Sequence, residues 1–120
     1  MRPWGPRLWI GLALSLTVVS HLWAAQQGLS TFEQIAVGAT AVGIATTTTN
    51  PTGRAQMNTC EVRVEAASVR FREDGTDPTS ALGSPLDDND TLTIPTNVRA
   101  RAIRFIRSAA SAVVNVRCYP

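Results

Sequence analysis

An alternation of apolar and charged residues beginning at Cys60 constrains the fold of this chain more than any other feature. Cys60, Val62 and Val64 are separated by charged residues at positions 61, 63 and 65. A period of two is the pattern of a β-strand with one buried face and one solvent-exposed face. The pattern therefore predicts a half-buried strand at the centre of the sequence.

The same stretch predicts where this strand ends. Val69 and Phe71 resume the alternation, but on odd-numbered positions. Because side-chain parity cannot change without an extra residue, we expect a bulge or a break between strands at Ala66-Ala67. Asp74 and Gly75 then favour a turn, since glycine adopts the positive φ that most residues resist.

Short alternations recur along the rest of the chain. Apolar pairs at 35 and 37 and at 42 and 44 predict two strands, which the β-branched tract 46–49 extends. Residues 50–53 have the composition of a type I turn. Further strands are expected at 91–95, at 98–106 with a bulge near 102–103, and at 113–118. Prolines and a glycine between 76 and 86 exclude a helix or a central strand.

The fold class that follows is all-β, a small antiparallel β-sandwich or barrel of about seven short strands. Outside the N-terminal segment no stretch has the apolar period of a helix.

The N-terminal segment has the composition of an export signal. Arg2 and Arg7 precede an apolar run at 8–19, and Ala24 and Ala25 end the segment. The sequence predicts a hydrophobic signal helix at 1–25, read as a signal peptide or signal anchor, and a single β-sandwich domain at 26–120. The apolar run is short for a spanning helix, which needs roughly 20 residues. An uncleaved anchor and a start codon assigned too far upstream remain alternatives. Residues 26–33 are expected to form a flexible lead-in.

Charge and histidine content exclude several functions. All eleven basic residues are arginine, and the nine outside the signal balance nine acidic residues. A neutral domain gives no support to nucleic-acid binding. The sole histidine is His21, so histidine-dependent nucleophiles are excluded once the signal is removed. Neither a zinc ligand set nor a phosphate loop is present, and we expect no cofactor and no enzymatic activity.

Two acidic groups need separate interpretation. Carboxylate-pair hydrolysis stays open on spacing alone, but Glu61 and Glu65 share the exposed face of one strand, where pairing with arginines across strands is the favoured interpretation. The cluster 87–90 offers oxygen ligands for calcium, yet such clusters are common hairpin connections. Asn89 also begins a glycosylation sequon with Thr91, relevant only in a eukaryotic secretory pathway.

Six arginines, at 70, 72, 99, 101, 104 and 107, favour a solvated or subunit-contacting face.

The two cysteines are predicted to form a disulfide. Antiparallel partners in one register keep a constant sum of residue numbers, and Cys60 with Cys118, Val62 with Val116 and Val64 with Val114 share one sum. The final strand is therefore expected beside the central one, with the cysteines within bonding reach. Two buried free thiols are the alternative, and the redox compartment decides between them.

The segment 62–83 resembles a recurrent segment of small, uncharacterised virion proteins of tailed bacteriophages. Those proteins share a core of the form Ala-Val-Arg-Phe/Trp-Arg-x-Asp-Gly-x-x-Pro-Thr, followed by a glycine and a late Phe-Ile/Arg strand. The matching residues here are Val69, Arg70, Phe71, Arg72, Asp74, Gly75, Pro78, Thr79 and Gly83. Residues 103–107 resemble the late strand, and residues 37–44 resemble the usual opening.

This resemblance implies a structural capsid or tail component, such as a decoration or accessory protein, with no catalytic residues. Its partners would be other protein subunits in a homo-oligomer or virion, and a membrane would be met only through an uncleaved N-terminal segment. The export-like segment and the cysteines depart from the family pattern, and imply either a periplasmic or secreted location or a prophage-derived gene recruited for export. The alternative function is a secreted or periplasmic β-sandwich that binds carbohydrate or a cell surface.

Overall fold

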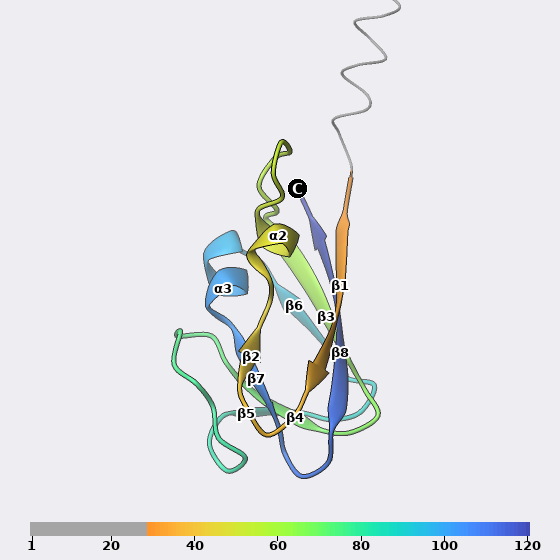
Figure 1. The fold of residues 1–120 in the computed structure, drawn as a ribbon, viewed down its shortest axis with the longest axis vertical. Coiled ribbons are helices and arrows are strands. Elements are labelled where there is room, and N and C mark those ends of the chain that lie inside the picture. The colour runs from red at the N-terminus through yellow and green to blue at the C-terminus, as the bar shows by residue number, and fades with distance from the viewer. Residues whose placement is uncertain (1–28) are drawn as a thin grey trace, which may run out of the picture.

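The strands build two four-stranded antiparallel sheets that pack face to face (Figure 1). The computed structural model describes residues 29–120. Eight strands and two short helices form this part of the chain, which confirms the all-β fold. The signal helix predicted at 1–25 lies outside the described residues.

The first sheet has the order β1-β8-β3-β6. Its strands are β1 (Thr31–Val37), β8 (Ala112–Tyr119), β3 (Thr59–Glu65) and β6 (Thr91–Ile94). The final strand β8 lies between β1 and β3 and pairs with both along most of its length. Long central strands with alternating buried and exposed residues account for this placement, because each needs a partner on both edges and a core on one face.

The second sheet has the order β2-β7-β4-β5. It consists of β2 (Val42–Gly43), β7 (Arg104–Arg107), β4 (Val69–Arg72) and β5 (Ser84–Leu86). Both edge strands are short, and Pro85 lies in one of them. Proline lacks the N–H that a central strand needs, so the position of β5 at the edge agrees with the prediction for 76–86.

The cysteine prediction is confirmed together with its register. Cys60 pairs with Cys118, Val62 with Val116 and Val64 with Val114 across β3 and β8. The Cys60–Cys118 disulfide joins Cα atoms 4.0 Å apart and spans 58 residues of sequence. Both cysteines are fully buried, so the bond lies in the core beneath β3 and β8.

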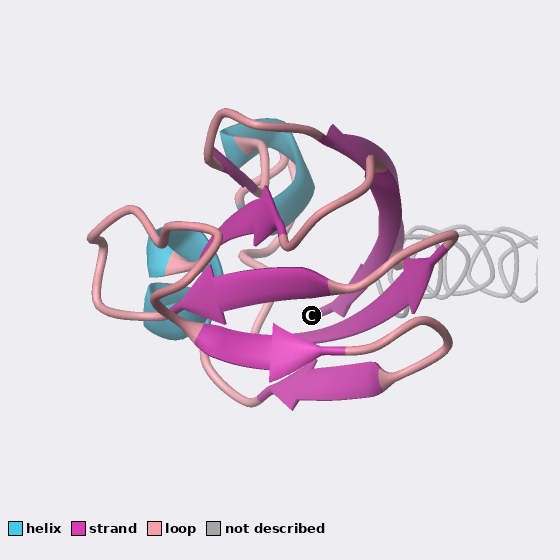
Figure 2. Ribbon diagram, turned by 90° about the horizontal axis from the view of Figure 1, so that it is seen from below, coloured by secondary structure: helices cyan, strands magenta, loops and turns pink. Residues whose placement is uncertain are grey.

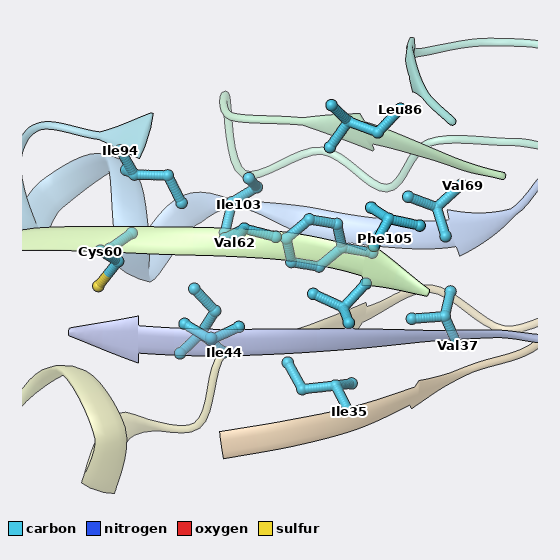
Figure 3. Close-up of a cluster of buried hydrophobic side chains, with 14 of the residues drawn as sticks. Ile35, Val37, Ile44, Cys60, Val62, Val69, Leu86, Ile94, Ile103 and Phe105 are labelled. Carbon is cyan, nitrogen blue, oxygen red and sulfur yellow. The ribbon is translucent and has the colours of Figure 1, made fainter. Parts of the chain in front are cut away.

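The core fills the space between the sheets (Figure 3). Phe105 of β7 and Val69 of β4 meet the inward-pointing valines of β3 and β8, and all are fully buried. Each such side chain contributes roughly 1.5–3 kcal/mol relative to an exposed one. Ile103, Ile94 and Met57 close the end of the core.

The parity change at 66–67 is a break between sheets. Ala66 has a φ of +76°, and the chain passes there from β3 in the first sheet to β4 in the second. A left-handed residue turns the backbone sharply, so the apolar side chains on both sides of the break point into the same core.

Parts of two predicted strands are helices in the structure, although residues 104–106 of the strand expected at 98–106 do lie in strand β7 (Arg104–Arg107). The tract 46–49 forms the single-turn helix α2 (Thr46–Thr49), and residues 97–102 form α3 (Asn97–Ala102). Glu33 of β1 accepts hydrogen bonds from the Ala45 N–H and the Thr48 hydroxyl, and these tertiary contacts override the β-propensity of threonine.

The helix α3 begins at the N-cap Thr96, whose hydroxyl accepts from the Arg99 N–H. The buried Asn97 amide donates to the backbone carbonyls of Thr49 and Met57, which ties α3 to the α2 connection. The parity shift at 102–103 is therefore the end of a helix and not a bulge. Figure 2 shows both helices beside the strands.

Two smaller expectations also need correction. The first strand begins at Thr31, so residues 31–33 are paired backbone and not a flexible lead-in. The turn expected at 50–53 lies one residue later, with the Arg54 N–H donating to the Pro51 carbonyl. Gly53 has a φ of +74°, which a type II turn requires at its third position.

No helix among residues 29–120 is long and apolar enough to cross a membrane.

Candidate functional site

The motif at 69–83 folds into strand β4 and the long β4–β5 loop, residues 73–83, which projects to the left in Figure 1. Arg72, at the end of β4, forms an ion pair with Asp74. Asp74 also accepts a hydrogen bond from the Thr76 N–H, and Gly75 between them has a φ of +79°. The Arg72 guanidinium, and then the Thr76 N–H, hold the pKa of Asp74 below its ordinary value. Asp74 and Gly75 therefore form the first turn of the loop.

The remaining motif residues shape the second half of the loop. The Thr79 hydroxyl accepts from the N–H groups of Ala81 and Leu82, and Pro78 is buried. Gly83 has a φ of +139°, and a Cβ there would lie 3.1 Å from both the Phe71 carbonyl oxygen and the Pro78 Cβ. A residue with a Cβ would be strained at this φ and would contact the Phe71 carbonyl tightly, which explains the glycine.

Arginines fasten this loop to the sandwich. Arg70 of β4 donates to the carbonyls of Ser80 (2.9 Å) and Gly83 (2.8 Å). Arg104 of β7 forms an ion pair with Asp77 and also donates to the Ala41 carbonyl.

A further ion pair joins Arg99 of α3 to Glu73 at the start of the loop. The guanidinium groups of β4, β7 and α3 thus act as structural braces for an irregular segment.

An open hollow of about 730 Å³ lies beside the loop. Phe71 and the exposed Leu82 supply its apolar part, and Arg99 and Glu73 supply charge. One carboxylate oxygen of Glu73, Oε1, is buried without a hydrogen-bond partner. The other oxygen of Glu73 is bound by Arg99, and Arg72 and Asp74, which also line the hollow, form an ion pair with each other.

The six arginines predicted to form one face do not do so. Arg99 and Arg101 belong to α3, whereas the other four belong to β4 and β7. The prediction assumed a single strand across 98–106, and the helix moves two of its members away from the sheet.

The acidic cluster at 87–90 forms the turn between β5 and β6. The Asp87 N–H donates to the Asp90 carboxylate, and Asn89 adopts a φ of +70°. Backbone bonds between Val64 and residues 89 and 90 attach this turn to β3. These contacts confirm that the cluster forms a hairpin turn, and no group of three histidine, cysteine, aspartate or glutamate side chains that could hold a metal is found within 29–120.

A second surface is formed by the exposed face of the first sheet, which we call the outer β3–β8 face. It carries Phe32 on β1, Asn115 and Arg117 on β8, Glu61, Arg63 and Glu65 on β3, and Thr91 and Thr93 on β6. Phe32 is 63% exposed. With Asn115 and Arg117 it borders a shallow hollow of about 350 Å³. An exposed aromatic ring beside an arginine and an amide side chain has a composition that is enriched in protein interfaces.

The charges of this face differ from those of the loop. Glu61 lies directly opposite Arg117 in the register of β3 and β8, as expected for pairing across strands. The ion pairs of residues 29–120 nevertheless involve Arg72, Arg99 and Arg104 only, so the predicted pairing of Glu61 and Glu65 with arginines is not made within the described chain. The four charges on the outer face remain available to a partner.

The sequence analysis missed Phe32 because it placed the residue in a polar lead-in. Parity would have identified it, since Phe32 is even-numbered while the buried Ile35 and Val37 are odd. An aromatic residue on the outward parity of a strand indicates an exposed sheet face.

Comparisons with known proteins give no match for this chain among family models, curated proteins or solved structures.

Proposed function

We propose that this protein is a non-enzymatic structural module that acts through protein–protein contacts, as a capsid decoration or tail accessory protein does. The observation that carries the proposal is the outer β3–β8 face, which combines an exposed Phe32 with charges that have no ion partner in residues 29–120. Interfaces are enriched in aromatic residues and arginine.

The virion assignment is supported by the sequence resemblance. The matching residues build the arginine-braced β4–β5 loop, so a family that shares the motif would share this loop. A loop that is fixed to the sandwich by hydrogen bonds and ion pairs suits a component that repeats in a lattice.

Particle isolation from the native source tests this function. Phage-like particles would be induced, purified on a density gradient and analysed by quantitative mass spectrometry. We expect the chain in the particle fraction in many copies per particle. Finding it only in the soluble fraction, and never with particles, would contradict the virion assignment.

We also propose that the chain is exported. Support comes from the basic and apolar composition of residues 1–25 and from the disulfide, because such bonds persist mainly in oxidising compartments. Sequencing the N-terminus of the native protein should give a start near Ala25 or Gln26. Recovery of intact Met1 in a soluble cytosolic form would contradict export.

A carbohydrate-binding or cell-surface-binding module is the second candidate function. It is favoured by the hollow on the outer β3–β8 face, where Phe32 lies with Asn115 and Arg63, since an aromatic platform beside amide and guanidinium donors suits a sugar. Binding to host cell-wall polysaccharide that is lost in Phe32→Ala would select this function.

A further inference from the structure

The charges of the outer β3–β8 face sum to zero. Glu61, Arg63 and Glu65 alternate along β3, and Arg117 lies on the neighbouring strand β8. A surface with equal numbers of both signs, and with no ion pair among the described residues, fits a surface of the same composition better than it fits a strongly charged partner.

The strand order makes this face suited to two-fold pairing. Consider a two-fold axis that runs parallel to the strands, in the plane of contact, between β3 and β8. Rotation about this axis reverses the strand order β1-β8-β3-β6 in the partner. Strand β8 then faces the partner's β3, and β1 faces the partner's β6. Two residues that are paired across β3 and β8 in one copy would therefore each face the other residue of the pair in the second copy.

The register then decides which charges meet. Glu61 and Arg117 are opposite one another, so Arg117 would face the partner's Glu61, and Glu61 would face the partner's Arg117. Arg63 is opposite Asn115 and would face the partner's Asn115, so like charges do not face each other there.

The outer parts of the face fit the same arrangement. Phe32 pairs with Arg117 across β1 and β8, and Thr93 pairs with Glu61 across β6 and β3, so these four residues form one row across the sheet. Phe32 would therefore cover the partner's Thr93, and the exposed aromatic ring would be removed from water.

We propose that a second copy of this chain binds face to face on the outer β3–β8 face, with reciprocal Arg117–Glu61 ion pairs about a two-fold axis. This inference rests on the proposed function, action through protein–protein contacts, and names a second copy of the chain as one partner. With strands about 4.8 Å apart and a rise of about 3.3 Å per residue, the residues of these four strands, of which β6 is the shortest, give a face of roughly 400 Å² per copy. That area is typical of small, transient interfaces, so the dimer is weak and its formation depends on concentration.

Charge reversal tests the arrangement. Arg117→Glu and Glu61→Arg would each be made in the full-length chain produced in an oxidising compartment, and the dimer dissociation constant measured by analytical ultracentrifugation. Each single variant should weaken self-association by about tenfold or more, because like charges then face each other twice.

An equimolar mixture of the two variants provides the decisive arm. In the mixed dimer the two substituted positions face each other with opposite charges, and the unchanged Glu61 of one chain faces the unchanged Arg117 of the other. Association should therefore return toward the wild-type constant, whereas an effect within one chain would not be rescued by mixing. Arg101→Glu is the matched control, because Arg101 is exposed on α3 and forms no ion pair with another of residues 29–120. Circular dichroism establishes that every variant is folded.

The outcomes separate this inference from the proposed function. Wild-type self-association that neither reversal weakens, or a mixture that fails to associate, would overturn the two-fold arrangement and leave the proposed function standing. A wild-type chain that stays monomeric at its highest soluble concentration would overturn the inference, while particle isolation would still decide the function. If the wild-type chain does not self-associate but binds polysaccharide, and Phe32→Ala abolishes that binding, both the two-fold dimer and the proposed structural function would be overturned.

Discussion

Arginines contact the β4–β5 loop and also lie on the outer β3–β8 face, yet they are used differently in the two regions. In the loop, Arg70, Arg99 and Arg104 bind backbone carbonyls or carboxylates of the same chain. On the sheet face, Arg63 and Arg117 form no ion pair with another described residue. The irregular loop needs side chains to satisfy its backbone, whereas a sheet satisfies its own backbone and leaves its exposed side chains free.

The sequence motif and the outer β3–β8 face therefore lie in different parts of the molecule. The motif residues that lie in the loop, from Asp74 to Gly83, are explained by turns, close approach and hydrogen bonds within the loop. The surface suited to a partner lies on the other sheet, in residues with no motif.

The largest expected effect on stability is that of removing the Cys60–Cys118 disulfide, which lies beneath the outer β3–β8 face. Replacing Cys60 and Cys118 together by alanine should lower the free energy of unfolding by about 4 kcal/mol, because the disulfide closes a long loop in the unfolded chain. Urea denaturation measures the loss. A loss under about 1 kcal/mol would show that the β3–β8 pairing needs no covalent support.

A smaller effect is expected in the loop. Gly83→Ala should lower the free energy of unfolding by about 2–3 kcal/mol, because it combines a positive φ with a Cβ placed 3.1 Å from the Phe71 carbonyl oxygen. Gly38→Ala is the matched control, since nothing lies within 4 Å of its added Cβ and its φ is not positive. Equal thermal stability of the two variants would contradict the close approach at Gly83.

The regular parts of this molecule were more predictable from the sequence than the irregular ones. The alternation from Cys60 and the matching spacing before Cys118 determined the strand pairing and the disulfide, because a half-buried strand repeats every second residue. The helix at Thr46–Thr49 was not predictable from propensity, since Glu33 stabilises it from a strand distant in sequence.

The candidate surface depended on information that the sequence alone lacks. Parity could have indicated the outward position of Phe32, which was instead assigned to a flexible lead-in, but only the strand order places it in the same row as Arg117. The ion partners of the arginines depend on the path of the β4–β5 loop, and long loops have no periodic pattern from which to predict it.

Arginine truncation compares the two regions directly. Arg70→Ala should lower the free energy of unfolding by about 1–2 kcal/mol, because it removes two charge-assisted hydrogen bonds to loop carbonyls. Arg117→Ala should change it by less than about 0.5 kcal/mol, as for other surface residues without an ion partner. Urea denaturation of both variants measures the difference, and the opposite ranking would contradict the assignment of structural and available charges.

The smallest effect is the pH dependence of the loop. Arg72 lowers the pKa of Asp74, so the contribution of Asp74 to stability is present above its unfolded pKa and is lost as the pH falls through the lower, folded value. NMR titration should give an Asp74 pKa below that of a model aspartate, and Arg72→Ala should raise it. An unchanged pKa in that variant would show that the ion pair does not form in solution.

A dilution series of the isotope-labelled protein followed by NMR tests the division between the two regions most directly. The account predicts concentration-dependent chemical-shift changes at Phe32, Glu61, Arg63, Asn115 and Arg117, with the β4–β5 loop unchanged. Shift changes centred on Leu82 and the loop, with a silent sheet face, would contradict it.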